Sequence, residues 1–239
     1  MKSKMIITAI ATLITMSLLT SCEKIKGKGD VITESRSAET FNTVSLAMSA
    51  TVYYTQDSLY SILISGQENI ISQIQTQVEG SELLIRLKHG VILSNYEPIR
   101  IYITAPDVNG LDVSGSGDIF TEMPWVAGET TLNISGSGSI NLAGISAENL
   151  TVNISGSGTI RAASGSVTLE KLKISGSGTI DLRSVEAGTV YSTTSGSGNT
   201  YVYAKDLLDV TISGSGNVWY YGTPAVNTHI SGSGNLKRM

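Results

Sequence analysis

Seven copies of Ser-Gly-Ser-Gly divide the second half of this chain at nearly even intervals. They begin at Ser114, Ser135, Ser155, Ser175, Ser195, Ser213 and Ser231, so successive copies are 21, 20, 20, 20, 18 and 18 residues apart. A fixed glycine signature with a period near 20 residues is typical of a solenoid, in which each coil buries its apolar face only by stacking on its neighbours. A flexible Gly/Ser linker has no reason to recur at constant intervals between β-branched residues.

Apolar residues alternate around every copy with the period of two that a β-strand requires. The residue just before each copy is Val113, Ile134, Ile154, Ile174, Thr194, Ile212 or Ile230. The residue two places earlier is Leu111, Leu132, Val152, Leu172, Ser192, Val210 or Thr228. The residue two places after each copy is Ile119, Ile140, Ile160, Ile180, Thr200, Val218 or Leu236. These three columns predict the core, with the glycines in the same inward phase and the serines facing out.

We therefore predict an all-β fold: a right-handed parallel β-helix-like solenoid with coils of about 20 residues and one short helix in the N-terminal half. Each Ser-Gly-Ser-Gly is interpreted as a bend in the coil wall, because an inward glycine marks a bend or a close backbone approach. Coils stacked at roughly 4.8 Å give a rod segment about 34 Å long. In the fifth coil Ser192, Thr194 and Thr200 replace the aliphatic core residues, so we expect this coil to be the least stable.

The repeat signature is missing from the N-terminal half, but strand patterns persist there. Segments 49–54, 60–65, 82–87 and 99–104 are β-rich and bounded by turn residues, and residues 67–73 suit one or two turns of helix. We interpret residues 40–110 as a β-rich capping region and residues 111–239 as the solenoid, with 40–239 forming one continuous domain. An independent N-terminal β domain is the alternative.

The N-terminus has the features of a lipoprotein signal peptide over residues 1–21. Lys2 and Lys4 precede an apolar stretch that is too short to span a membrane, and the stretch ends in Leu-Thr-Ser-Cys at Cys22. This ending resembles a lipobox, which predicts lipidation of Cys22 and a membrane anchor. Residues 22–39 are then expected to form a flexible tether. An ordinary signal peptide with a chance cysteine is the alternative.

Localisation and partners follow from this interpretation. Glu23 stands where an Asp would signal inner-membrane retention, so we expect an outer-membrane lipoprotein of the cell envelope, with the leaflet left open. Without Lys2 and Lys4, the chain carries 14 basic and 20 acidic side chains and a net charge of −6. This acidic balance argues against nucleic acid as a partner. Cys22 is the only cysteine, so no intrachain disulfide is possible.

The sequence gives little support for catalysis, so we expect no enzyme activity, no catalytic residues, no cofactor and no metal site. His89 and His229, the only histidines, are both expected at the surface, and no nucleophile elbow, phosphate loop or zinc-binding helix motif occurs. A carbohydrate-active enzyme would need clustered carboxylates on one face. The outward column that would show such a cluster does not: it contains Phe120, Asn141, Arg161, Asp181, Tyr201, Trp219 and Lys237.

That column holds the candidate ligand-binding residues, which are Tyr201, Tyr203, Trp219 and Tyr221. Stacking of the fifth and sixth coils would bring all four together on one outward face. One interpretation is an aromatic ladder that stabilises the sheet. The other is an exposed platform for a glycan or a protein partner. Arg161 and Asp181 are expected to form an exposed ion pair between adjacent coils. The outward serines are explained by the fold itself, although such hydroxyl arrays can also bind water or polysaccharide.

Several segments together carry a family resemblance: the signal with its cysteine, Phe41–Val44, Leu83–Ile85, Ile101–Pro106, and the run from Leu111 into the repeats. They resemble the bacterial envelope family called putative auto-transporter adhesin, head GIN domain. The resemblance implies a right-handed β-helix-like fold, a Gram-negative envelope location and an adhesion role, with no agreed catalytic residues.

We therefore expect a non-enzymatic cell-envelope lipoprotein that presents a rigid surface to a glycan or protein partner. A structural or assembly role of the solenoid edge or face is the first alternative. A carbohydrate-active enzyme is the second.

Overall fold

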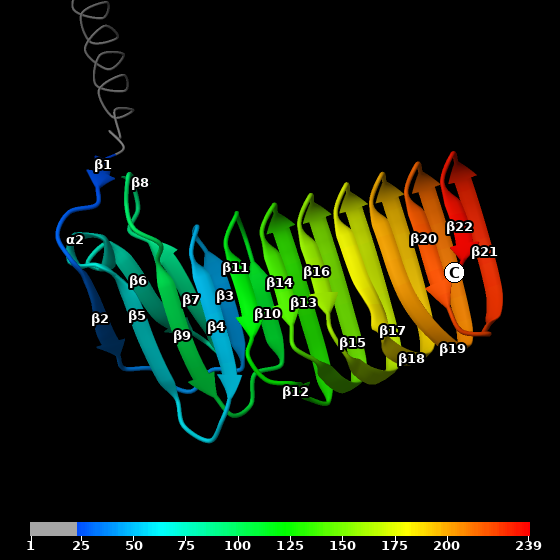
Figure 1. Cartoon of the computed structure of the whole chain (residues 1–239), viewed down its shortest axis with the longest axis horizontal. Helices are drawn as coiled ribbons and strands as arrows, with labels where there is room; N and C mark the ends of the chain where they lie inside the picture. The colour runs from blue at the N-terminus through cyan, green and yellow to red at the C-terminus, as the bar shows by residue number, and fades with distance from the viewer. Residues whose placement is uncertain (1–22) are drawn as a thin grey trace, which may run out of the picture.

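The computed structural model describes residues 23–239, which form a single long stack of β-coils (Figure 1). The N-terminal half contains β1 (Glu23–Lys26), β2 (Val31–Arg36), β3 (Thr43–Ala47), β4 (Thr51–Gln56), β5 (Ser61–Gln67), α2 (Glu68–Ile71), β6 (Ile74–Glu79), β7 (Glu82–Leu87), β8 (Val91–Ser94) and β9 (Arg100–Ala105). The repeat half contains β10 (Gly110–Val113), β11 (Asp118–Thr121), β12 (Trp125–Val126), β13 (Glu129–Gly136), β14 (Ser139–Leu142), β15 (Ile145–Gly156), β16 (Thr159–Ala162), β17 (Gly165–Gly176), β18 (Thr179–Gly196), β19 (Asn199–Gly214), β20 (Asn217–Tyr221), β21 (Ala225–Gly232) and β22 (Asn235–Arg238). The prediction of an all-β solenoid with one short helix is confirmed.

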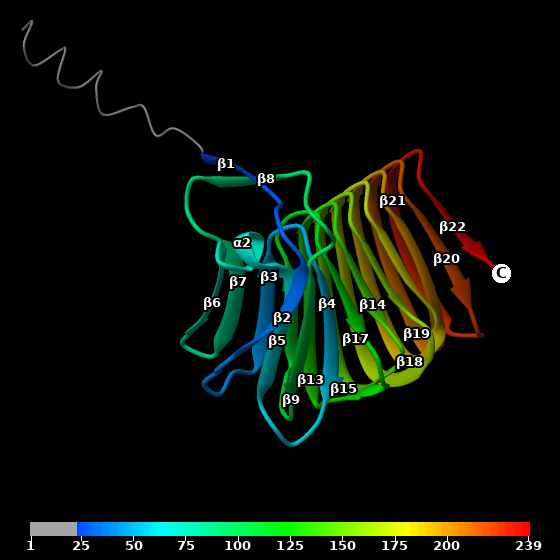
Figure 2. The same ribbon diagram turned by 60° about the vertical axis from the view of Figure 1, so that its left-hand side comes forward.

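Neighbouring coils pair in parallel and in register on both sides of each Ser-Gly-Ser-Gly corner. Before the corner, the ladder runs from β10 through β13, β15, β17, β18 and β19 to β21, with Ile134 beside Ile154 and Ser135 beside Ser155. After the corner, it runs from β11 through β14, β16, β18, β19 and β20 to β22. Figure 2, turned from the first view, shows the coils as a regular row.

The three predicted columns form the core of the first six coils. Their members from Leu111 to Val218 are at most 3% exposed. The seventh coil differs, because no described strand covers it: Ile230 is 37% exposed, Thr228 is exposed and Leu236 is half-buried. The core prediction is therefore confirmed for six coils and wrong for the last.

The glycines shape the corners for two separate reasons. The first glycine of each copy has a positive φ, for example 130° at Gly176, where a side chain would be strained. The second glycine meets the coil beneath it: a Cβ at Gly178 would lie 2.5 Å from Cγ2 of Ile154. The serines face outward and are exposed. Each Ser-Gly-Ser-Gly is thus a bend with close backbone approach, as predicted.

The coil length falls from 20 to 18 residues where β18 meets β19. The register shifts between Leu182 and Glu186, and again between Ala187 and Thr189. At the first shift, β18 has three residues that have no partner in β19. At the second shift, β19 has one residue more than β18, so the coil becomes two residues shorter. The first shift bulges Arg183 out of the ladder beside the aromatic residues of the next coil.

The N-terminal half continues the same sheets. β3 and β4 pair in parallel with β10 and β11, so Val44 lies beside Leu111 and Val52 beside Ile119. β7 and β9 extend the two sheets, and the end of the stack is closed by the antiparallel strands β2, β5 and β6. One cluster of buried side chains runs from Phe41 to Val218. Strands overlap all four segments in which the sequence predicted them, and α2 lies within 67–73.

The segment expected as a flexible tether is different in the structure. β1 pairs with β8, and β2 pairs with β5. The side chain of Ile25 packs against the core, and the backbone of Lys28 donates a hydrogen bond to Asn69 at 2.9 Å. These contacts hold residues 23–36 onto the cap. Cys22 and residues 1–21 lie outside the described residues. Within residues 23–239, no helix is long and apolar enough to cross a membrane.

Candidate functional site

One outward column crosses almost the whole stack on the sheet that follows the corners. Its members are adjacent in register and lie half-buried or exposed, and we call them the outward column: Leu63, Tyr102, Tyr53, Phe120, Asn141, Arg161, Asp181, Tyr201, Trp219 and Lys237. Aromatic residues lie toward both ends of this column, next to the terminal Leu63 and Lys237, and polar residues occupy its middle.

Tyr201 and Trp219 form the C-terminal aromatic stack. Their ring centroids are 4.6 Å apart with an interplanar angle of 8°. The guanidinium carbon of Arg183 lies 4.3 Å from the centroid of the Tyr201 ring. Because Arg183 comes from β18 and Trp219 from β20, they cover opposite faces of Tyr201, which lies on β19 between these strands. Tyr201 therefore presents its ring edge to solvent.

The other two predicted residues, Tyr203 and Tyr221, are register neighbours two positions along the same strands. Both are half-buried. They lie beside Gly222, whose φ of 93° turns the chain away from β20. A shallow hollow of about 490 Å³ opens here, lined by Tyr203, Lys205, Asp206, Gly222, Thr223 and Arg238. The structure thus brings all four predicted aromatic residues onto one face, with direct ring stacking only in the Tyr201–Trp219 pair.

The predicted ion pair between Arg161 and Asp181 does not form. Both oxygens of Asp181 instead accept hydrogen bonds from Arg183 on the same strand, at 2.7 and 2.9 Å. Arg183 lies two residues after Asp181, so alternation along the strand places both side chains on the same face. This contact raises the pKa of Arg183. Arg161 is exposed and has no ion-pair partner among the described residues.

A second aromatic stack lies toward the other end of the outward column, and of its members only Phe120 was placed in this column from the sequence. The rings of Tyr53 and Tyr102 stack at 5.3 Å, and those of Tyr53 and Phe120 at 5.8 Å. Tyr102 is 39% exposed and Phe120 is 36% exposed. Tyr53 and Tyr102 lie outside the repeats, so column counting from Ser-Gly-Ser-Gly never reached them. The sequence pattern that could have identified them is the alternation of apolar and polar residues around Val52 and Ile101, which matches the alternation around Ile119.

Some polar groups lie inside the core, away from this face. Glu170 is fully buried between Leu150 and Val190 of the adjacent strands, and neither of its carboxyl oxygens has a hydrogen-bond partner. Burial raises the pKa of this carboxyl well above its usual range. The hydroxyls of Ser192, Thr194 and Thr200 are buried without hydrogen-bond partners as well. None of these groups is accessible to a substrate.

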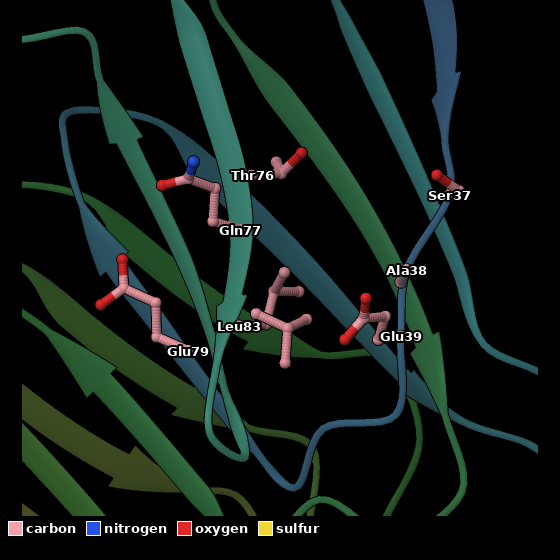
Figure 3. Close-up of a pocket in the computed structure, with 8 residues that line it drawn as sticks. Ser37, Ala38, Glu39, Thr76, Gln77, Glu79 and Leu83 are labelled. Atoms are coloured by element: carbon pink, nitrogen blue, oxygen red, sulfur yellow. The ribbon is translucent and has the colours of Figure 1, made fainter.

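Two histidines and a hollow at the cap are further surface features of residues 23–239. His89 and His229 are both exposed. Residues 23–239 contain no group of three or more His, Cys, Asp or Glu side chains placed to hold a metal ion. A hollow of about 460 Å³ lies at the cap, where Glu39, Thr76, Gln77 and Glu79 surround the buried side chain of Leu83 (Figure 3). It is open and polar, and its carboxylates point in different directions.

Comparison with known proteins gives a consistent result. The family model described as putative auto-transporter adhesin, head GIN domain matches residues 40–224. A putative adhesin from Bacteroides fragilis superposes with a TM-score of 0.86 at 24% identity, covering 90% of this chain and all of that one. A putative lipid binding protein and a putative adhesin, both from Parabacteroides distasonis, reach 0.78 and 0.75 at 25% and 20% identity, each covering 91% of this chain and all of the other. No curated protein matches the chain. The family indicates an adhesion-like role at the cell surface or envelope, and these neighbours have the same fold.

Proposed function

Because the chain belongs to the family of putative auto-transporter adhesin, head GIN domains, we propose that it is a non-enzymatic envelope lipoprotein whose solenoid binds a glycan or protein partner. The contacts are Tyr201, Tyr203, Trp219 and Tyr221. The observation that carries this proposal is the fixed array of aromatic residues on the face of strands β19 and β20, each of which is paired with a strand on both sides. Recognition there depends on side chains alone, and Tyr, Trp and Arg are the residues that most often dominate binding energy.

A glycan array tests the binding proposal with residues 23–239, which contain the whole core. The test variant is Tyr201→Ala/Trp219→Ala/Tyr221→Ala. The matched control is Tyr191→Ala, which removes a 43%-exposed tyrosine from the other sheet. Binding by the parent and the control that disappears in the triple variant supports a glycan site at these residues. Equal glycan binding by all three proteins would contradict the assignment of the site.

The membrane partner in this proposal is a lipid anchor on Cys22, which places the protein in the outer membrane. Two acyl chains hold a protein stably, whereas one holds it only marginally. Fractionation of cells expressing the precursor and Cys22→Ala tests the anchor. The parent is expected in the outer-membrane fraction and the variant in the soluble fraction. A variant that stays with the membrane would refute the anchor.

A structural role in envelope assembly is the second candidate function. The observation that favours it is the last described coil, where Val226 is 39% and Ile230 is 37% exposed beside Lys237 and Arg238. Such an edge can pair with another chain. Self-association that is abolished by Leu236→Asp/Lys237→Glu would favour this role over binding through Tyr201, Tyr203, Trp219 and Tyr221.

A further inference from the structure

The strands β1 and β8 form a two-stranded ribbon that is separate from the large sheet. We propose that the outer face of this β1–β8 ribbon is a docking surface for the phosphate headgroups of a lipid membrane. Cys22 directly precedes β1, so a lipid anchor on Cys22 leaves no spacer between the membrane and the ribbon. This inference rests on the proposed function, since it adds a second membrane contact beside that anchor.

Hydrogen bonds hold both ends of β1 to the body of the protein. At its start, the backbone N–H of Glu23 donates to the carbonyl oxygen of Gly90 at 2.7 Å. At its end, the side chain of Asn69 accepts from the backbone N–H of Lys28 at 2.9 Å and donates to the carbonyl oxygen of Lys26 at 2.8 Å. Residue 22 is one peptide unit from this fixed strand, a Cα–Cα separation of about 3.8 Å. An anchor on that residue therefore draws the ribbon itself to the membrane surface.

The two faces of the ribbon differ in chemical character. Ile25 and Leu93 are register neighbours, and both pack against the core. Because side chains alternate along a strand, Lys24, Lys26 and Ile92 occupy the opposite, outer face. Both lysines are exposed, and Ile92 is 51% exposed. An exposed isoleucine beside two lysines suits a membrane surface, where an apolar side chain enters the acyl boundary and ammonium groups meet phosphates.

The ribbon is a basic region on an acidic protein. Residues 23–28 carry three lysines and one glutamate, whereas the rest of 23–239 carries 11 basic and 19 acidic side chains. Within the described part of the chain, none of Lys24, Lys26 and Lys28 forms an ion pair. Their charges are therefore available to lipid phosphates, while an anionic surface repels the acidic remainder. This asymmetry orients the protein with the ribbon toward the membrane.

Docking through the ribbon alone is weak and reversible. Each lysine near an anionic surface strengthens binding by about fivefold, so three together contribute about a hundredfold. An acyl anchor combined with a basic patch holds a protein more firmly than either does alone. The Cys22→Ala protein is therefore still released when cells are fractionated. The ribbon lies at the N-terminal end of the stack, so the docked protein carries β19 and β20 toward the opposite end (Figure 1, Figure 2).

Co-sedimentation of residues 23–239 with vesicles tests the docking surface without the lipid anchor. The vesicles contain phosphatidylethanolamine mixed with either anionic phosphatidylglycerol or zwitterionic phosphatidylcholine. The parent is expected to bind the anionic vesicles about a hundredfold more tightly than the zwitterionic ones. Lys24→Gln/Lys26→Gln/Lys28→Gln is expected to remove this preference. Circular dichroism verifies that each variant is folded.

A matched control and a second readout separate the ribbon from net charge. Lys171→Gln/Lys173→Gln/Lys237→Gln removes the same charge from exposed positions elsewhere and should keep the preference to within about threefold of the parent. Residues 23–239 contain no cysteine, so Ile92→Cys can be labelled at one position with an environment-sensitive fluorophore. Its emission is expected to shift to shorter wavelength on the anionic vesicles. The same label at Val226→Cys, which replaces an exposed residue of the last coil, should not shift.

A parent without preference for the anionic vesicles overturns the inference. Equal losses in the two lysine variants also overturn it, because net charge alone then explains the binding, as does a label at Ile92→Cys that responds no more than one at Val226→Cys. The fractionation of Cys22→Ala tests the anchor separately. A precursor that needs Cys22 to reach the membrane fraction, in a protein without vesicle preference, leaves the proposed anchor standing and removes the ribbon as a docking surface.

Discussion

The third and fifth coils have the same shape but opposite cores. In the third coil the inward side chains are Val152, Ile154 and Ile160, and in the fifth they are Ser192, Thr194 and Thr200. Every one of these six residues is at most 2% exposed. The strands of both coils nevertheless keep the same parallel register through their corners. The path of a coil is therefore determined by the corner glycines and the backbone ladder, whereas the core side chains determine how stable that path is.

The largest effect is expected from alanine at a corner glycine. In Gly176→Ala and Gly196→Ala the new Cβ would lie 2.5 Å from the carbonyl oxygen of the glycine one coil below, at a positive φ in both cases. We expect each to lower the free energy of unfolding by about 3 kcal/mol or more. Urea denaturation measures this. If Gly196→Ala, in the fifth coil, lowers the free energy of unfolding much less than Gly176→Ala does, the corner glycine does not determine the path of both coils.

Replacement of the buried carboxyl in the fourth coil is expected to have the next largest effect. The folded-state pKa of Glu170 is raised, so above the unfolded pKa the unfolded chain releases a proton that the folded chain keeps. Stability is therefore greatest below the unfolded pKa and falls as pH rises, with a limiting slope of about 1.4 kcal/mol per pH unit. Glu170→Leu should flatten this fall and stabilise the protein at pH 7. Urea midpoints at pH 4 and pH 8 test it, with the exposed Glu186→Gln as control. If the stability of Glu170→Leu falls with pH as steeply as that of the parent, Glu170 is not the cause of the fall.

Reciprocal exchanges sharpen the comparison of cores. Thr194→Val and Thr200→Val keep the shape and remove a buried hydroxyl without a hydrogen-bond partner, so each should stabilise the protein by about 1 kcal/mol. Val152→Thr should cost about 1–3 kcal/mol. Amide exchange provides an independent measurement: among the buried coils, the strands around Thr194 are expected to exchange fastest. Slowest exchange there would show that the hydroxyls do not weaken the coil.

The smallest effect is expected at the bulge. Arg183→Ala removes the contact with the Tyr201 ring and the bonds to Asp181, all at the surface, and should cost about 0.5–1 kcal/mol. Thermal denaturation measures the loss. Lys205→Ala, which removes a 3.6 Å contact with Glu186, is the matched control. An effect as large as that of a corner glycine would mean that the bulge is part of the core.

Much of this fold could be predicted because one local signature repeats. The period located the corners, the alternation around it assigned Ile154 and its equivalents to the core, and stacking followed from both. The hydrogen bonds of Asp181 could not be predicted in this way, because their donor Arg183 lies in none of the columns that the repeat defines. Glu170 was missed since it lies in a part of the coil that the three columns do not include. The Tyr53–Tyr102 stack was missed because the cap has no repeat to count from.

The in-register ladder also determines how the molecule would respond to force. Its inter-coil hydrogen bonds run along the solenoid axis, so tension along that axis passes through the ladders in series, and the weakest ladder breaks first. Detaching one coil releases 18 to 20 residues, which can extend to roughly 65 Å in place of about 4.8 Å. A molecule pulled between its N-terminal end and a partner held at Tyr201 and Trp219, as proposed, would lengthen coil by coil and dissipate work at each step.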